Sequence, residues 1–330
     1  MYQKIRAFSL IFTKIPHSIY LWLAVIIGAA SGSITRKIIE IGEQNLVNGS
    51  NPISMCNVLF VGNLCAFVVM LPLFYQQLAP KVFRQFTCKD WSGLVAIATL
   101  SGAIAPGLIF AALDNASVTN VVLIGRIEPP IALALGVLFL RTSVNIWTVA
   151  GSIVSFGGVV AIAFFSSSEP TISMMGGLIQ LGKGEIQTAI AALILAVAGI
   201  LSKLGLQHVP LGFFSLFRTG LGTVIFFILA HYLYGAGHFA AIISPLLWKW
   251  MLLYGAIIVA AGQLFFFAGL KQASVAEITL ANSFQPLAAI AIAYLILQEV
   301  PTMAQYIGGG IILIGISLSA IGNISQNSNS

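Results

Sequence analysis

Long apolar stretches separated by short polar segments fill almost the whole chain. A helix needs about 20 predominantly apolar residues to cross a hydrocarbon core about 30 Å thick. Ten stretches near that length follow one another, so the pattern predicts an all-α integral membrane protein with ten transmembrane helices. The expected spans are 19–38, 53–75, 91–112, 118–140, 146–165, 185–204, 212–234, 246–270, 275–297 and 303–322.

Composition supports lipid as the main solvent of this chain. Of 330 residues, 58% are hydrophobic and 7% are charged, whereas a soluble domain is about 25% charged. The net charge of +6 comes without a basic cluster interleaved with aromatic residues, so we expect no nucleic-acid partner. The three cysteines match no metal or redox spacing, and we expect neither a metal nor another cofactor.

An internal repeat is the strongest signal in the sequence. The hexapeptide Leu-Asp-Asn-Ala-Ser-Val that starts at Leu113 returns as Leu-Lys-Gln-Ala-Ser-Val at Leu270, an offset of 157 positions. Apolar composition alone would not match Trp, Pro and Gly landmarks at one offset, so we infer a duplicated unit. These landmarks are Trp91 and Trp248, Pro129 and Pro286, Gly151 and Gly308, and Gly158 and Gly315.

Each predicted unit contains five spans. Because five is odd, the second unit enters the membrane from the opposite side, and the two units become inverted repeats about a pseudo-twofold axis in the membrane plane. The expected organisation is a tail (1–18), a first five-helix repeat (19–165), a linker (166–184), a second five-helix repeat (185–322) and a second tail (323–330).

The distribution of Lys and Arg predicts the orientation. With the N-terminus inside, nine basic residues lie on the cytoplasmic side and four on the other side, as the positive-inside rule requires. We therefore expect a multi-pass protein of the cell membrane (plasma or inner) with both termini in the cytoplasm. The nine are Lys4, Arg6, Lys14, Lys81, Arg84, Lys89, Arg141, Lys203 and Lys271, and the four are Arg36, Lys37, Lys183 and Lys249.

The fourth and fifth helices of both units share a motif. Ala-Ser-Val opens the fourth helix at 116–118 and 273–275, a proline follows in mid-helix, and the fifth helix is rich in glycine. This arrangement resembles the EamA-like family of the drug/metabolite transporter superfamily, from about residue 19 to residue 322. The resemblance implies ten helices in two units and transport of a small metabolite. Because the family carries amino acids, nucleobases, sugars and other metabolites on one scaffold, it does not imply one substrate.

The chain departs from the family pattern at two places. Family units often end the fourth helix with Leu-Gly-Glu, but here the units end with Leu-Arg-Thr at 140–142 and Leu-Gln-Glu at 297–299. Family units also often carry an Arg in the second helix. The second unit has Arg218, whereas the first has Asn57 and Phe60 nearby.

Ionisable side chains inside the predicted spans are candidates for the functional site, because a charge at the centre of a spanning helix costs ~2.5–3.5 kcal/mol. Arg126 lies near the midplane and either neutralises an anionic group of a solute or forms a structural ion pair. Glu128 either couples transport to protons or is the static partner of Arg218. Residues that are two positions apart in the sequence point ~200° apart around the axis of a regular helix. Arg126 and Glu128 are therefore not expected to share a face.

The matching segment of the second unit supplies amides. Asn282 and Gln285 are three positions apart and share a helix face, and Gln285 is the repeat partner of Glu128. The alternative role for these amides is hydrogen bonding that holds the helices together. We predict substrate binding by Arg126, Glu128, Arg218, Asn282, Gln285 and Gln263. Because proline removes a helix N–H donor, the predicted hinge or kink positions are Pro106, Pro129, Pro130 and Pro286.

These features favour a secondary-active or facilitative transporter that moves a small polar metabolite by alternating access. Two intramembrane arginines against one or two glutamates leave a nearly neutral cavity, which is compatible with an amino-acid-like solute. The expected partners are that solute and the lipid bilayer, with proton or ion coupling and a homodimer left open. A membrane-embedded enzyme acting on a lipid-linked substrate would need catalytic motifs that we do not find, so we expect no enzymatic activity. The third alternative is a channel, whose pore would need a symmetric assembly.

Overall fold

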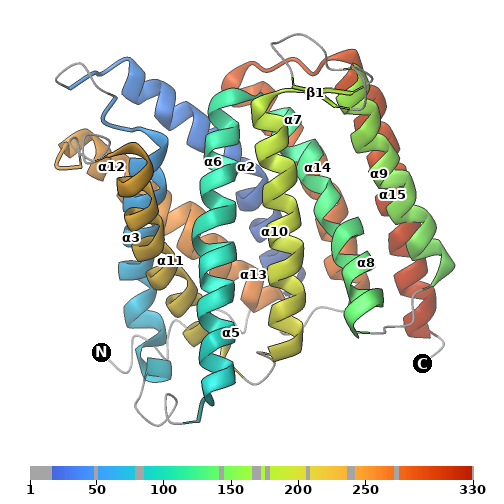
Figure 1. The fold of residues 1–330 in the computed structure, drawn as a ribbon, viewed down its shortest axis with the longest axis horizontal. Coiled ribbons are helices and arrows are strands. Elements are labelled where there is room, and N and C mark those ends of the chain that lie inside the picture. Colours follow the sequence, from blue (N-terminus) through green and yellow to red (C-terminus); the bar gives the residue numbers. More distant parts are fainter. Residues whose placement is uncertain are drawn as a thin grey trace.

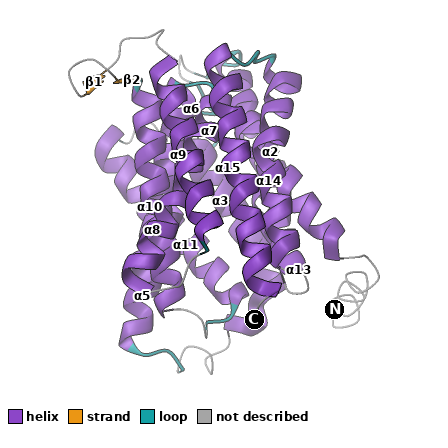
Figure 2. Cartoon of the chain, turned by 90° about the vertical axis from the view of Figure 1, so that its right-hand side faces the viewer, coloured by secondary structure: helices purple, strands orange, loops and turns teal. Residues whose placement is uncertain are grey.

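The computed structural model describes residues 17–47, 51–78, 85–140, 145–165, 172–174, 179–205, 209–235, 242–270 and 275–328. Long helices lie side by side in one bundle, and connecting segments gather at its two ends (Figure 1). Figure 2 shows the same alignment from a perpendicular direction. The described chain is thus built from helices that run between two opposite faces.

The first half contains five helical passages. The first two are α2 (His17–Glu43) and α3 (Met55–Phe74), and α3 continues into the 3-10 turn η1 (Tyr75–Leu78). The third joins α5 (Cys88–Thr99), the π-helical segment η2 (Leu100–Ile104) and α6 (Ala105–Asn115). The fourth joins α7 (Val118–Ile124), the 3-10 turn η3 (Gly125–Ile127) and α8 (Glu128–Leu140), and the fifth is α9 (Ile146–Phe165).

The second half repeats this order. It contains α10 (Lys183–Gly205), α11 (Leu211–Tyr234), a passage of α12 (Pro245–Tyr254), the π-helical η5 (Gly255–Ala261) and α13 (Gly262–Leu270), and then α14 (Val275–Leu297) and α15 (Met303–Ser328). A π-helical segment therefore interrupts the third passage of each half. Irregular backbone of this kind is often found at functional sites.

Every expected span coincides with a helical segment to within a few residues. Among the described residues, eight helical segments are long and apolar enough to cross a membrane, and two further apolar helices are shorter (Ile146–Ile162 and Phe284–Leu297). The chain is therefore a multi-pass helical membrane protein.

Two details differ from the sequence-based expectation. The linker contains two short strands, β1 (Ile172–Met174) and β2 (Ile179–Leu181), which pair antiparallel, whereas the sequence predicted helices alone. In each strand a polar residue stands between two apolar ones, an alternation typical of β-strands. The last helix also continues to Ser328, beyond the expected end of its span at 322.

Side-chain caps explain where several helices begin. The Ser54 hydroxyl accepts a hydrogen bond from the backbone N–H of Asn57, in the first turn of α3. At the start of α5, Thr87 and Asp90 form a reciprocal capping box. The Ser117 hydroxyl accepts from the backbone N–H of Asn120 at 3.2 Å and begins α7. These polar residues satisfy N–H groups that have no partner inside the helix.

Glycines bring α9 and α15 into close contact. A Cβ atom at Gly158 would lie 2.7 Å from the carbonyl oxygen of Gly308, and Gly151 approaches Gly315 in the same way. Between these crossing points the Ser155 hydroxyl donates to the carbonyl of Ile312 at 3.3 Å. Small residues allow membrane helices to associate through close backbone packing, so this pair forms a tight wall of the bundle.

The helices of the two halves pack against each other in a crosswise pattern. The first helix, α2, packs along α13 and α14 of the second half. Correspondingly α10, the first helix of the second half, packs along α6, α7 and α8 of the first half. In these contacts, which involve seven helices, the first helix of each half packs against helices of the other half.

Candidate functional site

Two separate cavities lie within the bundle, and no residue lines both. The larger has a volume of about 500 Å³ and includes Arg126, Glu128 and Gln285 in its wall. The smaller has a volume of about 140 Å³ and includes Arg218 and Gln263. The sequence analysis assigned these residues to one site, but in the structure they line two different cavities. The side chain of Asn282, the sixth predicted residue, lies outside the described residues.

Both halves of the chain build the larger cavity. The contributions come from α2, α6 and the passage of α7, η3 and α8 in the first half, and from α10, α13 and α14 in the second. Apolar residues predominate in the wall, with a few polar groups among them, as in most small-molecule sites. The described lining residues are Gly28, Ala29, Ser31, Gly32, Ile109, Leu113, Val118, Val121, Val122, Gly125, Arg126, Glu128, Pro129, Thr188, Ala192, Leu195, Phe266, Gln285 and Ala289.

The fourth passage is irregular where it carries the two charges. Arg126 lies in the 3-10 turn η3, and Glu128 begins α8. Pro129 and Pro130 follow and cannot donate backbone hydrogen bonds. A Cβ atom at Gly125 would meet nothing within 4 Å, so open space adjoins the turn. Irregular backbone inside a membrane is tolerated where it lines a cavity or is buried in protein.

Arg126 and Glu128 line the same cavity, although a regular helix would place them on different faces. The sequence analysis treated the segment as a regular helix and ignored side-chain length. Val122, Gly125 and Pro129 of the same passage also line the cavity, and the long side chains of Arg126 and Glu128 extend farther around a helix than short ones do. A cavity that encloses this face can therefore collect both charges.

Glu128 and Arg218, both among the residues that the structure describes, form no ion pair within 4.0 Å, and they line different cavities. Among the described residues, ion pairs within 4.0 Å join Arg36 and Lys37 to Glu40 near the end of α2. Arg126 and Glu128 are both partly buried, and they attract each other electrostatically. The larger cavity thus contains one positive and one negative group outside any close ion pair.

Gln285 reaches the larger cavity from α14. A Cβ atom at Gly28 would lie 3.1 Å from the Gln285 Nε2, so the amide packs directly over α2 at a glycine. Two hydroxyl groups lie in the same wall: Ser31 donates to the carbonyl of Gly28, and Thr188 donates to that of Gly184, both at 2.8 Å. Their oxygens retain the capacity to accept a further hydrogen bond.

Glu299 closes one end of the fourth passage. Its carboxylate accepts hydrogen bonds from the backbone N–H groups of Val118 (2.9 Å) and Thr119 (3.1 Å) and from the Thr119 hydroxyl (3.0 Å). The preceding residue, Gln298, has a φ of 57°, the left-handed conformation that favours glycine at a helix C-terminus. The chain turns here from α14 toward α15, and Glu299 lies where its carboxylate reaches the start of α7, at Val118 in the wall of the larger cavity.

A second polar cluster ties three helix ends together next to this cap. Asn120 of α7 donates from Nδ2 to Glu185 Oε1 of α10 at 2.7 Å. Gln305 of α15 donates from Nε2 to Asn120 Oδ1 at 2.6 Å. The sequence analysis missed this cluster and the Glu299 cap, because their members are far apart along the chain. Only the capping serine at 117 gave a local signal that this end is polar.

The predicted hinge residues lie in different surroundings. Pro106 directly follows the π-helical η2 and lines the smaller cavity. Pro129 lines the larger cavity and Pro130 follows it near the start of α8. Pro286 lies inside α14, which is continuous through that position. A hinge role for any of these residues remains a prediction.

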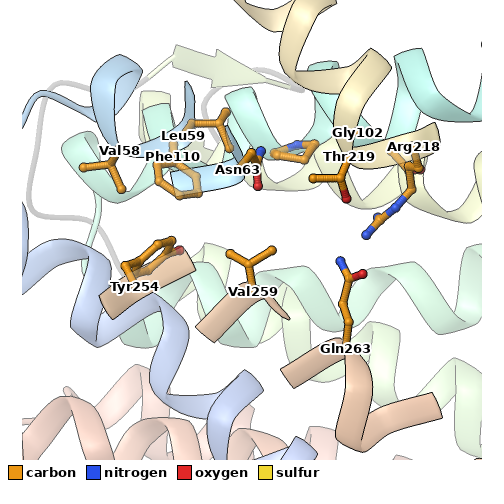
Figure 3. A pocket seen from close by; sticks show the side chains of 12 residues that line it. Val58, Leu59, Asn63, Gly102, Phe110, Arg218, Thr219, Tyr254, Val259 and Gln263 are labelled. Carbon is orange, nitrogen blue, oxygen red and sulfur yellow. The ribbon is translucent and has the colours of Figure 1, made fainter. Parts of the chain in front are cut away.

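The smaller cavity lies among α3, the third passage, α11 and the passage of α12, η5 and α13. Arg218 from α11 and Gln263 from α13 point toward each other across it, and Asn63 and Thr219 point into the same space (Figure 3). Tyr254 borders it, and its phenol oxygen accepts a hydrogen bond of 3.0 Å from the Thr35 hydroxyl of α2. Polar and apolar side chains both line this cavity, and none of its described lining residues is a carboxylate.

Comparison with known proteins gives the chain a family. The sequence pattern of the EamA-like transporter family matches it twice, over residues 19–164 and 182–321. A relative from Synechocystis sp., named "Uncharacterized transporter sll1164", is 49% identical over 95% of this chain and 89% of its own length. A second, "Uncharacterized transporter YxxF" of Bacillus subtilis, is 26% identical over 64% of this chain and 65% of its own length.

A solved structure shares the fold. Its title reads "Crystal structure of protein", and it superposes with a TM-score of 0.60 over 95% of this chain and 99% of its own chain. The sequence identity of 15% limits this likeness to the fold. The family pattern covers most of the sequence in two copies, and the residues that line both cavities lie within them. This chain therefore belongs to the EamA-like transporter family.

Proposed function

We propose that this protein is a transporter that carries a small polar organic solute through the larger cavity by alternating access. The observation that carries the proposal is the presence of Arg126 and Glu128 on one irregular passage, both lining that cavity. Ionisable groups within membrane spans are costly and mark substrate or ion pathways. The volume of about 500 Å³ is in the usual range for small-molecule sites.

The two halves act as inverted repeats in this proposal, with the first five-helix unit at 19–165 and the second at 185–322. Three observations support a pseudo-twofold axis through the larger cavity. The packing of α10 on the fourth passage corresponds to the packing of α2 on α14. The repeat partners Glu128 and Gln285 line the cavity together. The hydrogen bond between Ser155 and Ile312 joins positions that are themselves separated by the repeat offset of 157.

The proposed orientation places both termini in the cytoplasm of a cell whose surface membrane holds the protein. The first turns of α2 and the last turns of α15 lie at the same end of the bundle, the lower end in Figure 1. The excess of Lys and Arg expected at that end assigns it to the cytoplasmic side. The cap formed by Glu299 and the cluster of Asn120, Glu185 and Gln305 would then lie at the outer end.

The charges in the larger cavity favour a solute that carries both signs. The Arg126 guanidinium can hold a carboxylate by two parallel hydrogen bonds, and Glu128 can hold an ammonium group on the other flank. Gln285 offers neutral hydrogen bonds, and Val121, Val122 and Phe266 offer apolar contact to the rest of the solute. An amino-acid-like zwitterion fits this chemistry because the site has no net charge of its own.

Solute flux into proteoliposomes tests this proposal. We expect saturable flux of at least one member of a panel of amino acids, nucleobases and organic acids, its loss in Arg126→Gln, and a raised KM for that flux in Glu128→Gln, whose amide still accepts a hydrogen bond from the solute. Lys37→Gln, which neutralises an exposed cation that pairs with Glu40, should retain the flux. Normal flux in both cavity variants would refute the assignment of the site, and release of a chemically altered product would move the assignment to an enzyme.

Glu128 is also the carboxylate that would carry a coupling proton. If it does, an imposed pH gradient should drive solute accumulation in the wild-type protein. Glu128→Gln should then keep exchange of labelled against unlabelled solute but lose accumulation. Accumulation by the variant that still follows the gradient would refute the coupling role and leave the solute site unaffected.

A further inference from the structure

We propose that the smaller cavity is a binding site for a small monovalent anion, such as a halide or a short carboxylate, separate from the larger cavity. The polar residues in its wall on which the argument depends are Asn63, Arg218, Thr219 and Gln263. The proposal goes beyond the transported solute and does not depend on the solute's identity.

The charge balance of the two cavities is different. Among the residues that the structure describes, the larger cavity has one cation and one carboxylate in its wall, whereas the smaller has Arg218 and no acidic residue. In the described part of the chain no carboxylate oxygen lies within 4.0 Å of the Arg218 guanidinium. A guanidinium inside a membrane protein is always charged and needs compensation. One bound anion of unit charge would provide it.

Neutral donors converge on the same space as Arg218. The side chains of Asn63, Thr219 and Gln263 point into the cavity from three different helices (Figure 3). The Gln263 Oε1 is buried and makes no hydrogen bond to the described residues. Because the oxygen and nitrogen of an amide exchange places by a half-turn, Gln263 can present N–H groups to an anion held by Arg218.

Backbone packing fixes the position of Arg218. A Cβ atom at Gly102 would lie 2.7 Å from the carbonyl oxygen of Arg218 and 3.3 Å from its Cγ. The π-helical η2 therefore contacts α11 at this residue without a side chain between them. The packed helix crossing thus holds the backbone and the inner part of the Arg218 side chain, and a side chain with fewer free torsions binds an anion with less loss of conformational freedom.

The size of the cavity limits the ligand. A volume of about 140 Å³ is close to that of an engineered cavity of ~150 Å³ that takes benzene. It admits a halide, formate or acetate, and it is much smaller than the space of about 500 Å³ in the larger cavity. The site thus selects by size and by charge, with Arg218 as the anchoring group.

Equilibrium dialysis of the purified full-length protein against radiolabelled chloride and radiolabelled acetate tests the proposal. We expect saturable binding of at least one of them, at one anion per chain, and competition between the two identifies the preferred class. Arg218→Gln should weaken the binding at least tenfold, and Gln263→Leu several-fold. Arg126→Gln, which neutralises a cation in the other cavity, is the matched control and should leave the chloride affinity unchanged. Acetate that is held by Arg126 would be a second component of acetate binding, which this variant removes and Arg218→Gln keeps.

Three results would overturn the anion site: no saturable binding of either anion by the wild-type protein, unchanged binding by Arg218→Gln, or loss of chloride binding by Arg126→Gln. If Arg218→Gln does not give a monodisperse protein, Gln263→Leu and Thr219→Val test the anion site instead. Unchanged anion affinity in both of these variants would also overturn the proposal. Failure here is distinct from failure of the proposed transport. Solute flux that is lost in Arg126→Gln would still support the larger cavity when no anion binds the smaller one.

Discussion

Replacement of two neighbouring glycines in α9 tests how tightly this helix packs on α15. At Gly158 an added Cβ atom would lie 2.7 Å from the Gly308 carbonyl oxygen and 2.7 Å from Ile312 Cγ1, and both distances are too short for carbon. At Gly157 it would meet nothing within 4 Å. Gly158→Ala therefore forces the two helices apart, whereas Gly157→Ala adds a methyl group on an exposed surface.

The two substitutions change helix propensity equally, so that contribution of about 0.5–1 kcal/mol in favour of Ala cancels in the comparison. The remaining difference is the cost of overpacking, ~1–3 kcal/mol in a well-packed interior. Gly157→Ala should thus be neutral or slightly stabilising. Gly158→Ala should have a free energy of unfolding lower than that of Gly157→Ala by about 1–3 kcal/mol.

Thermal unfolding of the purified variants in one detergent measures this difference. In soluble domains of 150–250 residues each kcal/mol shifts Tm by ~2–4 °C, so we expect Gly158→Ala to unfold several degrees below Gly157→Ala. Gly308→Ala, on the opposite side of the same contact, should behave like Gly158→Ala. Equal Tm values for the two α9 variants would show that the helices are not packed at this distance.

Three further predictions concern the helix ends. Glu299→Gln replaces a carboxylate that accepts three hydrogen bonds at the start of α7, and it should cost ~1–3 kcal/mol in thermal unfolding; the same loss in Glu43→Gln, an exposed control, would contradict this explanation. Gln298→Gly should stabilise by about 1 kcal/mol, since Gln298 has a φ of 57° and only glycine adopts it without strain; an unchanged Tm would count against that strain. Cys88 is exposed, whereas the other two cysteines are buried, so a membrane-impermeant maleimide should label it rapidly only in permeabilised cells, and labelling in intact cells would reverse the proposed orientation.

The structure shows what the residues at the end of α14, where the chain departs from the family motif, do in this protein. The Leu-Gly-Glu ending seen in family units corresponds here to Leu297, Gln298 and Glu299. The middle position is the left-handed residue after α14, which explains a preference for glycine there. The last position supplies the carboxylate that caps α7. Both roles survive in this unit, although the middle residue is glutamine.

The sequence by itself determined the helices and the repeat. The length of each apolar stretch is set by the thickness of the bilayer, so the expected spans agree with the helices to within a few residues. The offset of 157 paired Glu128 with Gln285, and these two residues do line one cavity. Helix length and internal duplication depend only on the order of residues along the chain, so both can be predicted from the sequence.

Only the tertiary structure decided which polar groups meet. Arg218 and Gln263 lie apart from Arg126 in a second cavity, although all three seemed members of one site. Arg126 and Glu128 share a wall because a 3-10 turn and two long side chains allow it. Contacts such as Glu299 with Thr119, or Asn120 with Glu185, join helices that are distant along the chain. Such distances follow from how helices cross and pack, and no local pattern of residues encodes them.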